Sequence, residues 1–127
     1  MKYLGIDYGL SHIGLAISDG YLAEPHSQLP NLSDEQSAEY LAKLCQEEGV
    51  GKVIVGISES KMAERTNDFI ATLKAHVKIP VLLTDETLSS QEALQKLIQA
   101  GAKRKKRQSK THQTAAAIIL QNWLESE

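Results

Sequence analysis

The sequence predicts an α/β fold, a five-stranded mixed sheet flanked by helices, and three observations support this prediction. Two apolar runs, residues 2–8 and 12–18, flank a short turn that contains glycine and serine, a pattern typical of a β-hairpin. Residues 52–57 and 81–84 are short apolar runs with β-branched side chains, as in strands buried on both faces. Amphipathic segments with helix start and stop signals separate the later runs, which favours strands alternating with helices.

The first half of the chain is predicted to continue from the hairpin into a third strand and a helix. The third strand covers about 21–30 and ends near Pro30. Ser33 and Gln36 match a capping box, so a helix is expected from about 34 to 48, and Gly49 ends it.

The second half is predicted to contain two further strands and three helices. After the strand at 52–57 and a polar loop, the remaining elements are a helix to about residue 76, a short strand at 81–84, a helix from 89 to 101, a basic linker at 102–110 and a last helix at 111–125.

Composition limits the class of protein. The 127 residues suffice for one core, so we expect a single domain that spans 1–127. No basic segment precedes the first apolar run and no run approaches membrane-spanning length, which predicts a cytoplasmic protein. The one cysteine, Cys45, excludes an intramolecular disulfide and a cysteine metal cluster, and its helical pattern favours a buried thiol.

Basic residues are concentrated in one short segment. The net charge is −2, yet six of the 14 basic residues lie within 103–110. A basic segment on an otherwise acidic chain favours a local contact with phosphates, and a solvated loop without a partner is the alternative. The candidate nucleic-acid contacts are Arg104, Lys105, Lys106, Arg107 and Lys110.

Asp7 and the pair Asp85–Glu86 are the candidate catalytic carboxylates. Each follows a predicted buried strand, and ligands of open α/β sheets bind outside the carboxyl ends of the strands. Mg²⁺ takes one or two carboxylates together with substrate phosphates. Two such ions about 4 Å apart can activate a water and stabilise a leaving oxygen in phosphodiester hydrolysis. His112 is predicted to lie on the sheet-facing side of the last helix, where it would complete the set.

Each of these candidates also has a purely structural interpretation. Asp7 could satisfy the amides of its own turn, the Asp85–Glu86 pair could complement a helix N-terminus, and His112 could cap its helix. His76 lies beside a predicted loop and receives no role.

Four segments resemble motifs of the YqgF/RuvX family. Residues 5–9 (GIDYG), with the following IGLA, are similar to the first motif, and 53–56 (VIVG) to the central strand. Residues 85–90 (DETLSS) are similar to the motif Asp-Glu-Arg-Leu-Thr/Ser-Thr, and 115–120 (AAAIIL) to the C-terminal helix. The segments span essentially the whole chain in the right order. The resemblance implies an RNase H-like fold and a pre-16S rRNA nuclease, in a family formerly assigned to Holliday junction resolution.

The resemblance also implies roles for individual residues. It makes Asp7 the first catalytic aspartate and metal ligand, and Glu86 the second acid, with Asp85 beside it. Glu59, at the end of a predicted central strand, is a reserve candidate for the second acid. The third acid of the family is an aspartate that opens the last helix, and His112 occupies its place.

Two departures from the family pattern bear on activity. An imidazole at His112 leaves the metal site one negative charge poorer and shifts the preference from Mg²⁺ towards Mn²⁺ or another transition metal. Thr87 stands where the family has an arginine, which removes a bidentate phosphate donor.

We therefore expect a nuclease that uses Mg²⁺ or Mn²⁺ to cleave structured RNA, in 5′-end processing of pre-16S rRNA, with the pre-ribosomal particle as a partner. A weakened nucleic-acid-binding or ribosome-associated module and a Holliday junction resolvase are the alternatives, and a resolvase would need a two-fold dimer. A sugar kinase or actin-like ATPase shares the Asp-x-Gly turn, but the length and the missing P-loop disfavour it.

Overall fold

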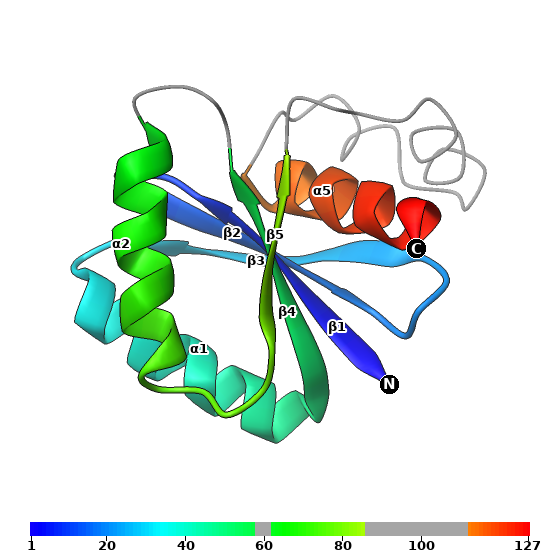
Figure 1. Ribbon diagram of the computed structural model, residues 1–127, viewed down its shortest axis with the longest axis horizontal. Coiled ribbons are helices and arrows are strands. Elements are labelled where there is room, and N and C mark those ends of the chain that lie inside the picture. The colour runs from blue at the N-terminus through cyan, green and yellow to red at the C-terminus, as the bar shows by residue number, and fades with distance from the viewer. Residues whose placement is uncertain (58–61, 86–111) are drawn as a thin grey trace.

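The structure is a computed structural model and describes residues 1–57, 62–85 and 112–127. Within these ranges it contains five strands and three helices (Figure 1). They are β1 (Lys2–Tyr8), β2 (His12–Ser18), β3 (Ala23–Pro30), α1 (Asp34–Glu48), β4 (Val50–Ile57), α2 (Met62–Lys74), β5 (Val81–Asp85) and α5 (His112–Ser126).

The five strands form one mixed sheet in the order β3-β2-β1-β4-β5. The β1–β2 and β2–β3 pairs are antiparallel, whereas β4 is parallel to both β1 and β5. This arrangement confirms the predicted five-stranded mixed sheet. Because β1, β4 and β5 run in the same direction, their carboxyl ends lie along one edge of the sheet.

Helix α1 begins and ends at its predicted signals. Ser33 adopts an extended conformation as the N-cap, and its hydroxyl accepts a hydrogen bond from the Gln36 amide at 3.1 Å. Gly49 ends the helix in the left-handed conformation, with φ of 72°, and its N–H donates to the carbonyl of Cys45. Local capping chemistry therefore sets both ends of this element.

Other boundaries differ by a few residues from the predictions. Strand β4 begins at Val50 rather than 52, and α2 ends at Lys74 because the amides of His76 and Val77 both donate to the carbonyl of Leu73 in a closing turn. The predicted helix at 89–101 and the basic linker at 102–110 lie outside the described residues.

Helices cover both faces of the sheet (Figure 1). Helices α1 and α2 pack on one face, over a core whose completely buried members include Phe69, Leu4, Ile6, Leu41 and Leu73. Helix α5 packs on the other, over a smaller cluster with many short side chains: Ala16, Ala23, Ile54, Ala116, Ala117, Ile119 and Leu120.

Cys45 is buried in the larger core, as the sequence predicts, and burial raises the pKa of its thiol to about 11. Among the described helices, none has both the length and the apolar character needed to cross a membrane.

Candidate active site

Asp7 is the last but one residue of β1 and is half-buried. Its cross-strand partners are Gly14 on β2 and Gly56 on β4. Directly paired residues of adjacent strands project to the same face of a sheet. Because both partners are glycines, the two positions paired directly with Asp7 carry no side chain.

Gly5 brings α5 unusually close to β1. A Cβ atom at Gly5 would lie 2.7 Å from Cβ of Leu120 and 2.9 Å from the carbonyl oxygen of Ala116. Such contacts are too short for a real side chain, so this approach of helix to strand requires glycine. Gly5 and Asp7 are two residues apart on β1 and therefore share the face on which α5 packs.

The packing of α5 along β1 extends towards Asp7. The rings of Tyr3 and Trp123 lie 5.6 Å apart, and Gly5 meets Leu120 and Ala116, so the helix runs opposite to the strand. Two strand residues span about 6.8 Å, and one helical turn spans about 5.4 Å. Two residues beyond Gly5 on β1 comes Asp7. One turn before Ala116 on α5 comes the first turn of the helix, which begins at His112.

Hydrogen bonds from Asn31 hold the turn that follows Asp7. The Asn31 side-chain amide donates to the carbonyl of Gly9 at 2.8 Å, and its backbone N–H donates to the carbonyl of Ser11 at 2.9 Å. The Ser37 hydroxyl in turn donates to the Asn31 side chain. Nothing in the sequence points to this role of Asn31, because an asparagine between a strand and a helix cap carries no signal for so distant a partner.

Tyr8 anchors the end of β1 on the opposite face. Its hydroxyl donates to Oδ1 of Asp34 at 2.7 Å, and its ring stacks on Phe69 with the centroids 4.5 Å apart. Burial, followed by the hydrogen bond to Asp34, raises the pKa of Tyr8, so its hydroxyl keeps its proton at neutral pH and can donate this hydrogen bond. Asp7 is thus flanked on its C-terminal side by a fixed residue and a fixed turn.

The other predicted site residues are placed only in part. Asp85 is the last residue of β5 and pairs with Ile57, while Thr84 pairs with Gly56, the neighbour of Asp7. The carboxyl end of β5 therefore lies at the same edge of the sheet as Asp7, two strands away. Glu86, Glu59 and Thr87 lie outside the described residues, as do Arg104, Lys105, Lys106, Arg107 and Lys110.

Solved structures share this fold. RuvC from Thermus thermophilus superposes with a TM-score of 0.66 at 15% identity, and the match covers 99% of this chain and 95% of that one. A fowlpox virus resolvase in complex with Holliday junction DNA gives 0.60 at 14% identity, covering 99% and 98% of the two chains. These likenesses show that the chain shares its fold with RuvC and with the fowlpox virus resolvase.

The chain belongs to the RuvX family, whose model, described as Holliday junction resolvase, matches residues 1–126. A relative from Syntrophomonas wolfei is 36% identical over 98% of this chain and 94% of its own length. One from Halothermothrix orenii is 37% identical with the same coverage. Both relatives bear the name "Putative pre-16S rRNA nuclease". Family membership confirms the resemblance seen in the sequence.

Proposed function

We propose that this chain is a divalent-metal-dependent nuclease that hydrolyses phosphodiester bonds of structured RNA in 5′-end processing of pre-16S rRNA. The names of the relatives and the family supply the class of reaction. The observation that carries the proposal is the position of Asp7. It lies at the carboxyl edge of the sheet between two glycines, two residues beyond the point where Ala116 of α5 packs on Gly5.

The donors available at this edge fit a divalent cation. Asp7 is a half-buried carboxylate whose two directly paired residues are glycines. Glu86 follows β5, and His112 begins α5. Carboxylate oxygens suit Mg²⁺, and an added imidazole favours Mn²⁺. A pair of such ions supplies activation of the attacking water and stabilisation of the leaving oxygen.

The register of β5 favours Glu86 over Asp85 as the second acid. Thr84 pairs with Gly56, which pairs with Asp7, so these three positions belong to one face. Successive strand positions alternate between faces, which assigns position 85 to the opposite face. An extended backbone would return to the Asp7 face at position 86. We therefore assign Glu86 as the ligand and leave Asp85 as its neighbour.

The remaining roles follow from position and charge. Asp7 holds metal from the centre of the sheet, and His112 binds or orients at the first turn of α5. The basic residues of the 102–110 linker, which joins this edge to α5 along the chain, hold the phosphate backbone; such contacts position a substrate without reading its sequence. Arg104, Lys105, Lys106, Arg107 and Lys110 are the residues we assign to this task.

Cleavage of a labelled pre-rRNA leader with Mg²⁺ or Mn²⁺ tests the proposal. We expect the natural chain to cut and Asp7→Asn to lose at least about a hundredfold, since even outer contacts of metal ligands are worth about 10–100-fold. Asp68→Asn, an exposed aspartate on α2, is the matched control and should cut normally. If the natural chain and both variants bind the RNA and none of them cleaves it, the result would contradict a nuclease and favour a binding module.

A four-way DNA junction is the second candidate substrate. The description of the family as Holliday junction resolvase favours it, and structural neighbours include a resolvase bound to such a junction. Paired symmetric cuts require a two-fold dimer. Cleavage of the junction by a dimer, with the RNA leader left intact, would replace RNA by branched DNA in the proposal.

A further inference from the structure

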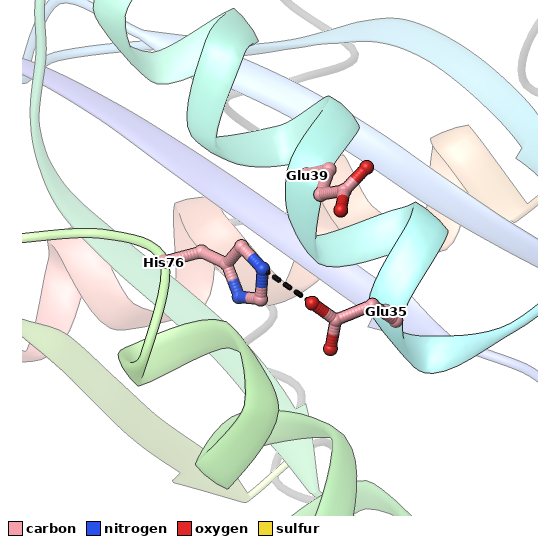
Figure 2. A group of neighbouring side chains, drawn as sticks. All are labelled: Glu35, Glu39 and His76. Atoms are coloured by element: carbon pink, nitrogen blue, oxygen red, sulfur yellow. Dashed lines mark ion pairs between the residues drawn. The ribbon is translucent and has the colours of Figure 1, made fainter.

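A second group of titratable side chains lies where α1 meets the end of α2, on the face of the sheet opposite to α5. Glu35 and Glu39 are one helical turn apart on α1, and His76 follows α2 by two residues. Their ligand atoms all lie within 4.8 Å of one another. Figure 2 shows the imidazole of His76 directed at the carboxylate of Glu35, with Glu39 one turn along the helix.

The hydrogen bonds of His76 hold its imidazole between a carbonyl oxygen and a carboxylate. Nδ1 lies 2.9 Å from the carbonyl oxygen of Thr72, and Nε2 lies 2.7 Å from Oε1 of Glu35. A carbonyl oxygen can only accept, so Nδ1 carries a proton and donates it. In a neutral imidazole, Nε2 would then turn its lone pair towards an anionic oxygen. A proton shared between Nε2 and Oε1 accounts for this 2.7 Å contact, and a metal ion can replace that proton once the carboxylate has moved away.

The surroundings favour positive charge and admit ions from solvent. The Thr72 carbonyl, and then the carboxylates of Glu35 and Glu39, raise the pKa of His76, while partial desolvation acts in the opposite direction. The carboxyl end of α2 adds a partial negative charge from the helix dipole. The side chains of His76 and Glu35 are 23% and 62% exposed, so an aqueous ion can reach them.

We infer that Glu35, Glu39 and His76 bind a divalent transition-metal ion such as Zn²⁺, which clamps α1 to the end of α2. One imidazole and two carboxylates form a donor set that suits these ions. A metal-bound histidine usually donates its other N–H to a carbonyl or carboxylate, which is what Nδ1 does to Thr72. Ligands about 2.1 Å from Zn²⁺ lie about 3.4 Å apart, so the exposed glutamates need to move by only about 1 Å.

The clamp is separate from the proposed nuclease centre. Asp7 and Gly5 share the face covered by α5, whereas α1 and α2 pack on the other face (Figure 1). A metal ion here would hold two helices together and would take no part in cleavage. Failure of either proposal therefore leaves the other intact.

Side-chain NMR of the histidines in the full chain, titrated with Zn²⁺ and with paramagnetic Co²⁺, tests the clamp. His76→Gln assigns the resonance. We expect the His76 signals of the natural chain to shift with Zn²⁺ and to show large paramagnetic shifts with Co²⁺. Glu39→Gln, which removes one ligand but keeps the Glu35 hydrogen bond, should weaken binding at least tenfold. Glu47→Gln, an exposed glutamate farther along α1, is the matched control and should bind normally.

Two results would overturn the inference. The His76 signals could respond to pH but not to either metal, which would leave an ordinary ion pair with Glu35. Alternatively, Glu39→Gln could bind as tightly as the natural chain, which would show that the two carboxylates do not act together. Cleavage of RNA by Glu39→Gln, measured alongside, should equal that of the natural chain.

Discussion

The two faces of the sheet are packed with side chains of different size. Helices α1 and α2 pack on the sheet through large residues such as Phe69, Leu41 and Leu73, whereas α5 packs closely on the small residues Gly5 and Ala16. Large buried side chains contribute most of the hydrophobic stabilisation. Small ones let backbones approach and fix a helix in one position. One face mainly stabilises the fold, and the other holds α5 close against β1, the strand that carries Asp7.

The largest effect is expected from Leu73→Ala on the stabilising face. Leu73 is completely buried, and a Leu→Ala change in a core costs about 2–5 kcal/mol. Denaturant unfolding should show this loss, while cleavage at 25 °C stays within about threefold because Asp7 and α5 keep their places. Leu83→Ala, half-exposed on β5, is the control and should lie within about 0.5 kcal/mol of the natural chain. A large loss of activity in folded Leu73→Ala would contradict the idea that this face contributes stability rather than activity.

Gly5→Ala should lower the rate of cleavage more than it lowers stability. The added methyl would meet Leu120 and the backbone of Ala116, so α5 must shift. Overpacking costs about 1–3 kcal/mol. A displacement of about 1 Å at a site can cost about a hundredfold in rate, and we expect a loss of that size in single-turnover cleavage by the folded variant.

Gly51→Ala is the matched control for this change. Its new methyl would lie 2.6 Å from Cγ of Met1, a flexible and exposed side chain that can move aside. Cleavage by Gly51→Ala should therefore equal that of the natural chain. Equal activity of Gly5→Ala and Gly51→Ala would refute the positioning role of α5.

His112→Asp tests whether the first turn of α5 supplies a metal ligand. It restores the aspartate that the family resemblance implies at this place and returns one negative charge to the metal site. The ratio of Mg²⁺-supported to Mn²⁺-supported cleavage should rise by about tenfold, because imidazole ligation favours the transition metal. Initial rates across a titration of each metal measure the ratio. An unchanged ratio would remove His112 from the ligand set.

The smallest effect is expected from Lys105→Gln in the basic segment. Loss of one phosphate contact should weaken RNA binding a few-fold and lower the slope of log K against log salt by about 0.7–0.9. Binding measured at several salt concentrations gives the slope, and Lys43→Gln on α1 is the control. If both variants keep the natural slope, Lys105 makes no phosphate contact.

Elements with local signals could be predicted closely from the sequence. Strands 2–8 and 12–18 have the bounds read from their apolar runs, and α1 has those set by Ser33 and Gly49. Strand β4 was predicted to begin two residues late, because Val50 and Gly51 owe their strand geometry to pairing with distant β1 rather than to their own pattern. Local chemistry is visible in a single sequence, and pairing between distant segments is not.

The same distinction applies to the sites. Asp7 can be proposed from the sequence because the apolar run before it and the glycines around it are local. The two glycines that flank it across the sheet, Gly14 and Gly56, become its neighbours only through strand register. The group around His76 was missed for the same reason, since residues on two helices meet only once those helices pack.

The position of α5 also has a consequence for the order in which the molecule is completed during translation. The larger core is assembled from residues up to Val81, and these leave the ribosome first. Gln121 accepts from the amide of Ala23 at 2.7 Å and donates to the carbonyl of Tyr21 at 3.1 Å, which ties the last helix to the turn between β2 and β3. Until α5 emerges, the small residues on which it packs, Gly5, Ala16 and Ala23, lack this cover. A nascent chain can thus assemble its larger core before α5 covers the other face of the sheet.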